Sequence, residues 1–289
     1  MPDQPHLVVF GPGYSAGRVA ALLAARGWRV SGVRRAARER AIAIDDEPGI
    51  AAALATATHI LSSVPPDRDG DPVLARYASA IATAPAGWSG YLSSTGVYGD
   101  TNGAWVDESA PVRVGEGRGG RRAAAERAWS ALRPDMRVFR LPGIYGPGRS
   151  ALDRVAAGAA HRVDKPDHVF SRIHVDDIAA AVVASLTRGR AGAYNIADDR
   201  PAHGNDVVAF AAALLRLPMP PMLPDESSLS PMARSFWAES RRVASGRARR
   251  LLGWQPRYPD YRAGLRALSA ITSPASTSTD PSAAVADQR

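Results

Sequence analysis

The sequence predicts an α/β protein with a parallel sheet that carries helices on both faces. Short apolar or β-branched runs alternate with longer helical patterns through the first half of the chain. This alternation is typical of βαβ units, which place helices over both faces of a sheet. The chain has 289 residues, of which 45% are apolar and 22% charged, so it is long and apolar enough to bury one large core.

The elements follow in chain order, and most end at glycine or proline. Strands are predicted at 6–10, 28–33, 60–64, 91–95 and 138–141, and helices at 14–26 and 121–132. Beyond about residue 146 the pattern changes to a strand at 169–175, a helix at 178–186 capped by Asp176 or Asp177, an extended run at 193–196, a helix at 207–215 and a proline-rich loop at 217–231. The tail 272–289 is rich in Ser, Thr, Ala and Pro, which predicts disorder.

Composition excludes several classes of function. The chain has no cysteine, which excludes disulfides, thiolate metal sites and a cysteine nucleophile. The net charge of +8 comes almost wholly from scattered arginines, and no basic run is interleaved with aromatics, so we expect no nucleic-acid partner. Six dispersed histidines without ligand spacing predict no metal. The chain shows neither a membrane span nor a signal peptide, which predicts a soluble, cytoplasmic protein.

A glycine-rich turn at 11–16 joins the first strand to the first helix. Gly11 permits the tight turn, Gly13 lets the backbone approach a pyrophosphate, and the small Ala16 lets the helix pack against the strand. The helix that opens with Tyr14 and Ser15 offers free N–H groups and a partial positive charge to phosphates. This combination predicts a dinucleotide site in a Rossmann-type doubly wound sheet.

The end of the second strand predicts which dinucleotide is bound. A dinucleotide fold usually places an acidic residue there to hold the adenosine ribose. This chain has Arg34 and Arg35 instead, and an arginine favours a 2′-phosphate through a bidentate contact. We therefore expect NADP(H) to be preferred, with NAD as the lesser possibility. A solvated basic turn is the alternative interpretation.

Five further segments complete a pattern that resembles the extended short-chain dehydrogenase/reductases, which include nucleotide-sugar epimerases and dehydratases. They are LSSTGVYG (92–99), LPGIYGPGR (141–149), RIHVDD (172–177), YNIA (194–197) and LGW (252–254), and their order matches over roughly residues 6–270. The resemblance implies one NAD(P)-binding Rossmann domain over 1–271, with a small C-terminal substrate-binding lobe formed mainly by 146–271.

The resemblance also implies roles for individual residues. Ser94 matches the catalytic Ser/Thr that hydrogen-bonds the reacting oxygen. Ser62, Ser63 and Val64 match the strand end beside the adenosine, and Pro142, Gly143 and Ile144 match the segment beside the nicotinamide. On the substrate side, the register implies Tyr145, Arg149, Arg172 and His174.

The chain departs from the family at its proton donor, a Tyr-x-x-x-Lys pair on a helix. The only lysine is Lys165, preceded four residues earlier by His161, and the expected positions fall at or next to Arg118 and Arg122. A guanidinium does not deprotonate in proteins, so neither arginine can act as the acid or base. This departure resembles the atypical, YeeZ-like branch of the superfamily.

Other residues are candidates for the missing chemistry. Tyr98 lies just past Ser94 and is the candidate proton donor, with a wall residue as its alternative. Arg118 and Arg122, one helical turn apart, are candidates for holding a substrate anion, with a solvated helix face as the alternative. The adjacent loop acids Asp107 and Glu108 are expected to be solvated, with a carboxylate pair for acid/base chemistry as the alternative.

Two functions therefore remain open. One is an NADP(H)-dependent oxidoreductase or epimerase-like enzyme that acts on a small polar substrate, either anionic or sugar-nucleotide-like, as a monomer or a homodimer. The other is a non-catalytic NADP(H)-binding sensor or scaffold, which the missing Tyr-x-x-x-Lys pair favours.

Overall fold

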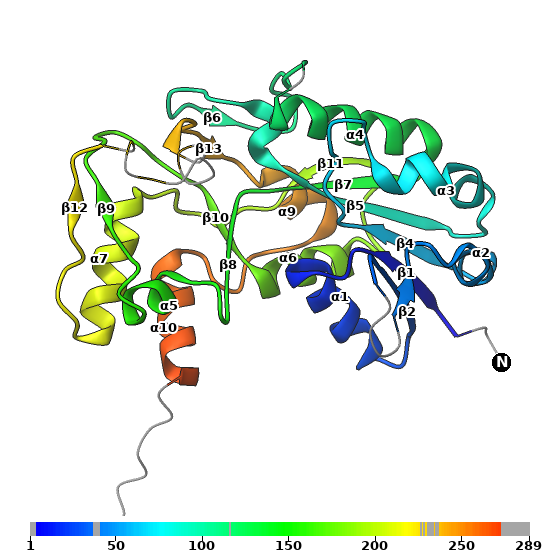
Figure 1. Cartoon of the computed structure of the whole chain (residues 1–289), viewed down its shortest axis with the longest axis horizontal. Helices are drawn as coiled ribbons and strands as arrows, with labels where there is room; N and C mark the ends of the chain where they lie inside the picture. Colours follow the sequence, from blue (N-terminus) through cyan, green and yellow to red (C-terminus); the bar gives the residue numbers. More distant parts are fainter. Residues whose placement is uncertain are drawn as a thin grey trace, which may run out of the picture.

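The computed structural model describes residues 4–36, 41–115, 117–225, 227, 229, 234 and 237–272, and it has two parts (Figure 1). The larger part is built on a sheet of seven parallel strands within the described residues, in the order β11-β7-β5-β4-β1-β2-β3. This is the doubly wound order, which confirms the predicted fold class. The strands are β1 His6–Phe10, β2 Arg29–Arg34, β3 Ile42–Ala43, β4 His59–Ser62, β5 Trp88–Ser94, β7 Met136–Leu141 and β11 Gly192–Asn195.

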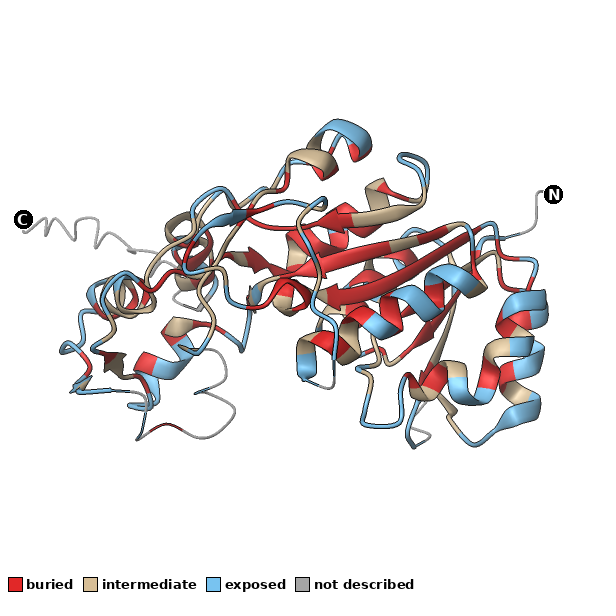
Figure 2. Ribbon diagram, turned by 90° about the horizontal axis from the view of Figure 1, so that it is seen from above, coloured by how far each residue is buried: buried red, intermediate tan, exposed pale blue. Residues whose placement is uncertain are grey.

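Two layers of helices cover the sheet and bury its central strands, drawn in red between the helices in Figure 2. One layer holds α1 Tyr14–Ala24, α6 Val175–Ala184 and α9 Gly246–Leu252, and the other holds α2 Glu47–Ala55, α3 Pro72–Thr83 and α4 Arg118–Leu132. Leu7 and Val9 join the first core, whereas Val8 and Phe10 join the second. β1 is therefore apolar throughout because both of its faces are buried.

The smaller part is a lobe with a core of its own. It contains α5 Ala151–Ala156, α7 Gly204–Leu215 and α10 Tyr261–Thr272, with β9 Arg162–Val163 and β12 Met222–Leu223 at its edge (Figure 1). The strands β8 Gly143–Tyr145 and β10 Arg172–His174 pair in parallel between the lobe and the sheet. Two further short strands, β6 Trp105–Val106 and β13 Arg242–Val243, pair with each other, and the 3₁₀ helix η1 Thr95–Tyr98 follows β5.

Several elements in the second half differ from the sequence prediction. Only 172–174 of the strand predicted at 169–175 form β10, because Phe170 pairs instead with Ala202 in an isolated bridge. The predicted loop 217–231 contains β12, which pairs with β9. Of the predicted tail 272–289, Thr272 ends α10 and the remainder lies outside the described residues. Within 146–271, β11 joins the main sheet, and α6 and α9 pack on it.

The prediction that Asp176 or Asp177 caps the helix after β10 is wrong. This helix, α6, begins at Val175, and its N-cap is His174, whose Nδ1 accepts a hydrogen bond from the Asp176 N–H (3.2 Å). The Asp177 carboxylate instead accepts the N–H groups of Arg257 (2.7 Å) and Tyr258 (3.1 Å). The end of β10, set by its pairing with β8, decides where the helix begins.

The helices of the described residues are too short or too polar to cross a membrane.

Candidate functional site

The glycine loop lies at the carboxyl end of β1, where the sheet order reverses between β4 and β2. Ligands bind in the crevice at such a switch point. Gly11 has φ +71°, and its N–H donates to the Val33 carbonyl (2.9 Å), which closes the turn onto β2. A Cβ added at Gly13 would meet only the Gly11 oxygen, at 3.9 Å, so the space in front of Gly13 is open to a ligand. The loop therefore has the shape that a pyrophosphate requires.

Alanine at Gly11 is expected to weaken nucleotide binding at least about tenfold, because its Cβ would lie 2.9 Å from Val64 Cγ2 in a left-handed backbone conformation. Titration calorimetry with NADPH measures this loss. Gly27→Ala is the matched control: its φ is +81° and its added Cβ meets no atom within 4 Å. It therefore carries the backbone strain alone and should bind like the wild type. Equal binding by the two variants would contradict the role of Gly11.

The first turn of α1 can receive an anion. Its N-cap is Gly13, with no side-chain cap and no acidic residue in the first turn among the described residues, so backbone N–H groups remain for a phosphate. Ala16 is fully buried where the helix meets the sheet, and Ser15 is half-buried. The Tyr14 hydroxyl donates to the Pro147 carbonyl (3.1 Å), which joins this turn to the segment that leads into the lobe.

Arg34 ends β2 beside the glycine loop. Its Nη2 donates to the carbonyl oxygen of Pro12, at 2.6 Å, so the guanidinium is held against the loop although the residue is exposed. Arg35 follows and is also exposed. The carboxyl end of β2 therefore presents a cation to the crevice.

The end of β4 forms the other wall of this crevice. The Ser63 hydroxyl donates to the Gly11 carbonyl oxygen, and the Val64 side chain packs against Gly11. Ser62 is completely buried. The structure thus brings 62–64 into contact with the glycine loop.

Ser94 and Tyr98 have different surroundings. Ser94 is half-buried at the end of β5, and its Oγ accepts the Gly96 N–H (3.1 Å), which leaves its own proton available. The Tyr98 hydroxyl donates to Asn195 Oδ1 (2.8 Å) and accepts from Arg140 Nη1 (2.9 Å), and burial raises the pKa of the phenol. Tyr98 therefore belongs to a buried hydrogen-bond network. Proton transfer from its hydroxyl to a substrate would require the hydrogen bond to Asn195 to break.

Helix α4 carries Arg118 and Arg122, and neither lines the lobe cavity described below. Arg122 Nη1 donates to the Tyr91 hydroxyl (2.9 Å) and the Leu92 carbonyl (3.4 Å), so it is tied to β5. The start of α4 lies against η1, because a Cβ added at Gly119 would come within 2.3 Å of the Gly96 oxygen. These contacts fix α4 close to Ser94.

A buried ion pair beneath α4 was missed by the sequence reasoning. Arg140 of β7 and Glu126 of α4 are each 8% exposed, with Nη2 and Oε2 2.7 Å apart, and the Ser93 hydroxyl also donates to Glu126 (2.5 Å). An arginine and a glutamate that lie 14 positions apart on different elements follow no spacing from which the sequence predicts an ion pair. Glu108, expected to be solvated, is half-buried and accepts the Asn195 N–H (2.7 Å).

A cavity of about 540 Å³ opens between β8 and the lobe helices. Gly143, Ile144, Tyr145, Arg149 and Arg172 line it, so the structure brings the segment predicted to lie beside the nicotinamide together with three of the predicted substrate residues. Pro142 precedes this segment at the end of β7. His174 is 1% exposed and does not line the cavity, since it packs between the rings of Tyr145 and Tyr258.

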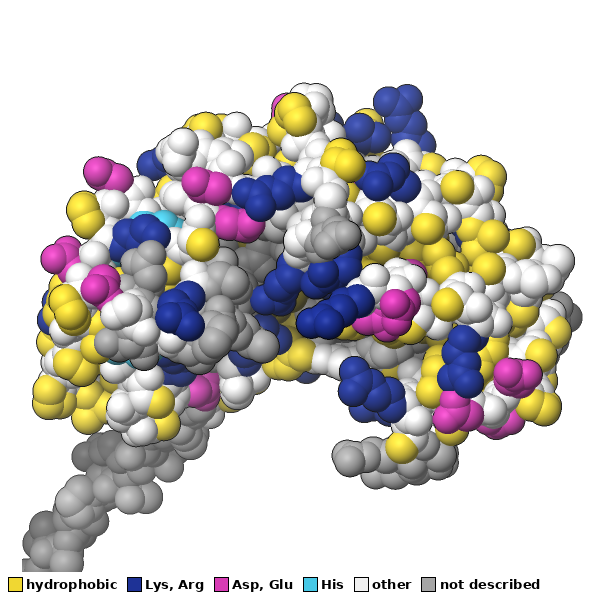
Figure 3. Space-filling view, turned by 45° about the horizontal axis from the view of Figure 1, so that its top comes forward, with side chains coloured by type: hydrophobic (Ala, Val, Ile, Leu, Met, Phe, Trp, Pro, Cys, Tyr) yellow, Lys and Arg dark blue, Asp and Glu magenta, His cyan; other side chains and the backbone are white. Residues whose placement is uncertain are grey.

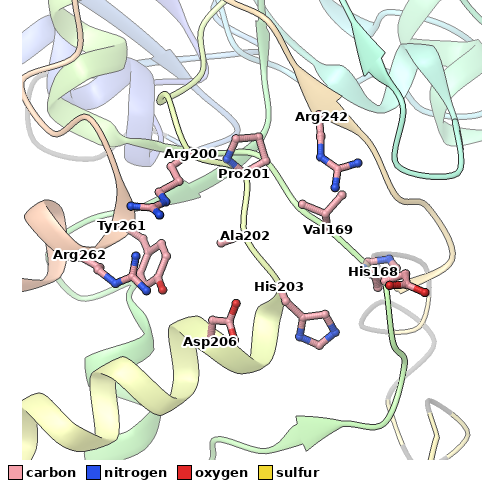
Figure 4. Close-up of a pocket in the computed structure, with 11 residues that line it drawn as sticks. His168, Val169, Arg200, Pro201, Ala202, His203, Asp206, Arg242, Tyr261 and Arg262 are labelled. Atoms are coloured by element: carbon pink, nitrogen blue, oxygen red, sulfur yellow. The ribbon is translucent and has the colours of Figure 1, made fainter.

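A second, smaller hollow of about 350 Å³ lies beside the β-bridge between Phe170 and Ala202. Figure 4 shows Arg200 and Arg262 on one side of it, Arg242 on another, and Asp206 reaching in from the start of α7. Tyr261 lines both hollows. The mixed charges of this second hollow favour neither an anion nor a cation.

Cationic side chains gather around the hollow between the two parts of the molecule, where Figure 3 shows them in dark blue.

Among the described residues, no three His, Asp or Glu side chains come close enough together to hold a metal ion.

No family model matches the chain. A solved structure of a functionally unknown conserved protein from Silicibacter pomeroyi is 43% identical, with a TM-score of 0.82, and the match covers 93% of this chain and 99% of that one. A human epimerase family protein, SDR39U1 (isoform 2), solved with NADPH, has the same fold at 18% identity, with a TM-score of 0.71 and coverage of 91% and 99%.

A curated relative, the 3-diazoavenalumate denitrifying reductase of a Streptomyces species, is 33% identical over 177 residues. The match covers 55% of this chain and spans 58% of the relative's length. Both solved structures share the fold of this chain over more than nine tenths of its length. The chain therefore has the fold of the NAD-dependent epimerase/dehydratase proteins, which fits the resemblance of its motifs to the extended short-chain dehydrogenase/reductases.

Proposed function

We propose that this protein is an NADPH-dependent reductase that transfers hydride to a small molecule held in the lobe cavity. The observation that carries the proposal is Arg34, which is held by Pro12 against the open glycine loop at the carboxyl end of β2. A guanidinium there would pair with a 2′-phosphate, which NADPH has and NADH lacks. Gly11, Gly13 and the first turn of α1 would hold the pyrophosphate, and 62–64 the adenosine side.

The cavity would hold the substrate beside the nicotinamide. Bound NADPH supplies hydride chemistry, and the backbone of Gly143 and Ile144 would form the wall beside its reactive ring. Ser94, with a free hydroxyl proton, would donate a hydrogen bond to a substrate oxygen. Both assignments agree with the roles that the family resemblance implies.

The two arginines of α4 affect which chemical groups could accept the hydride. A carbonyl acceptor becomes an alkoxide that must gain a proton, and neither Arg118 nor Arg122 can supply one. An acceptor that already carries a positive charge needs no acid: an arenediazonium ion that gains hydride exchanges a C–N bond for a C–H bond and releases N₂. The curated relative is named for denitrifying a diazo compound. We therefore include cationic acceptors of this kind in the proposed substrate range.

Calorimetric titration of NADPH and NADH tests the cofactor assignment. We expect NADPH to bind about 10- to 100-fold more tightly than NADH, and Arg34→Ala to remove most of that difference. The matched control is Arg29→Ala, which removes the same charge from the other end of β2 and should keep the preference. A preference unchanged in Arg34→Ala, or no binding of either nucleotide, would overturn the assignment.

Turnover separates the enzyme from a sensor. NADPH oxidation with an arenediazonium carboxylate, measured by absorbance and by N₂ release, supports the reductase. Tight NADPH binding without turnover on diazonium, iminium or carbonyl acceptors would instead support the non-catalytic sensor.

A further inference from the structure

The lobe cavity is walled largely by apolar side chains. Val207 and Val208 of α7, Leu265 of α10 and Ile144 of β8 line it. Phe170 and Trp237 add aromatic surface. Apolar walls stabilise the apolar body of a ligand and leave its polar groups without hydrogen bonds. A ligand of this cavity therefore has an apolar body with few polar groups.

The cavity also contains one half-buried cation, Arg172. Its Nη1 donates to the carbonyl oxygens of Phe170 (3.0 Å) and Ala202 (2.9 Å), which fixes the guanidinium in place. No carboxylate lies within ion-pair distance of it among the described residues. A half-buried guanidinium without a direct counter-ion is partly desolvated, so a ligand anion that reaches it gains a charge-assisted interaction.

Asp198 is the acidic group that acts most strongly on the charge of Arg172, but the two side chains form no ion pair. The carboxyl group of Asp198 is 2% exposed, and its Oδ2 has no hydrogen-bond partner among the described residues. Burial raises the pKa of Asp198 to about 8, so this carboxyl is mostly protonated at neutral pH. Arg172 therefore has no counter-ion in direct contact at the cavity wall, although Asp198 and Asp206 act on its charge from a distance.

The remaining charges at the cavity also favour an anion. Arg149 and Arg154 line the cavity near α5. The Asp153 carboxylate, which also lines it, accepts hydrogen bonds from the Ser150 N–H and hydroxyl in the capping box of that helix. Burial, together with the nearby charge of Arg154, lowers the pKa of His161 and so favours its neutral form. The cavity thus combines apolar walls with a fixed cation on its wall and two exposed cations at its side.

We propose that the lobe cavity binds a small organic acid with an apolar, arene-sized body, its carboxylate on Arg172 and its body between α7 and α10. The proposal rests on the proposed function, because it names the substrate class of the same site. It differs from a sugar nucleotide, which carries many hydroxyl groups and two phosphates that apolar walls would leave unpaired. The carboxylate would fix one end of the acid, and the arene would lie among the apolar side chains of the cavity.

Titration calorimetry with 2-naphthoate and 2-naphthamide tests the charge requirement on one arene body. In the presence of saturating NADP⁺, we expect naphthoate to bind at least about tenfold more tightly than the amide, and UDP-glucose to bind more weakly than naphthoate. Arg172→Gln should reduce naphthoate affinity to that of the amide while leaving NADPH affinity unchanged. Arg242→Gln is the matched control, because Arg242 is half-buried, bonds a backbone carbonyl (Gly103) and lines the other hollow (Figure 4).

A second variant keeps the test valid if Arg172→Gln fails to fold. Val208→Trp would fill the cavity from the half-buried face of α7 and should abolish naphthoate binding without changing NADPH binding. Equal binding of the acid and the amide, or tighter binding of UDP-glucose, would overturn the proposed substrate class. If NADPH still binds in that case, the failure concerns the substrate class; if NADPH does not bind either, the proposed function itself has failed.

Discussion

Replacing Arg140 with methionine is expected to lower the free energy of unfolding by about 3–5 kcal/mol. Arg140 Nη2 lies 2.7 Å from Glu126 Oε2, its Nε lies 3.2 Å from both carboxylate oxygens, and both side chains are 8% exposed. Methionine would fill much of the space but leave the buried carboxylate of Glu126 without its counter-ion. It would also remove the hydrogen bond that Arg140 donates to the Tyr98 hydroxyl. For a domain of this size, the melting temperature should fall by roughly 2–4 °C per kcal/mol.

Chemical denaturation followed by circular dichroism measures this loss. Arg76→Met is the matched control, because Arg76 pairs with Asp45 on the surface, where the two side chains are 45% and 71% exposed. Such a solvent-exposed pair is screened by water and contributes little to stability. The double variant Glu126→Leu/Arg140→Met should regain most of the stability, since it leaves no charge buried. A loss in Arg140→Met no greater than in Arg76→Met would show that the buried pair contributes little.

Asp198→Asn is expected to remove a fall in stability that the wild type shows as pH rises from about 4 to about 8. Burial raises the pKa of Asp198 from 3.8 to about 8, against the opposing effect of Arg172 and together with the carboxylates of Asp199 and Asp260. Between these two values the folded protein keeps a proton that the unfolded chain releases. The unfolded state then binds fewer protons, so the free energy of unfolding falls with rising pH, by at most about 1.4 kcal/mol per pH unit from this group.

Urea denaturation at a series of pH values measures the slope. Asparagine stays neutral at every pH, so the variant should be more stable than the wild type above about pH 8, and this advantage should vanish near pH 4. Asp45→Asn is the control, because Asp45 is exposed, pairs with Arg76 at the surface and does not act on Asp198. The buried Asp177 carboxyl, whose pKa is raised to about 6, adds a slope of the same sign below about pH 6 in all variants. Parallel curves for the wild type and Asp198→Asn would contradict the prediction.

The glycine loop and the strands around it could be predicted from the sequence because local chain geometry determines them. Gly11 must adopt a positive φ, and the apolar run of β1 is continuous because helices cover both faces of the sheet. The position of Arg34 at the end of β2 follows from the strand length alone. These features depend on residues that are neighbours in sequence, so their spacing carries the information.

The surroundings of the polar side chains were decided by tertiary structure. His174, and not Asp176 or Asp177, caps α6, because pairing with β8 sets the end of β10. Arg122 is tied to β5, whereas Arg172 lines the lobe cavity, although both are arginines predicted to bind substrate. The fold buries Asp198, and this burial raises the pKa of its carboxyl group. The free energy of a charged group depends on the partners and the solvent that distant segments bring to it or exclude, so it can be read only from the folded chain.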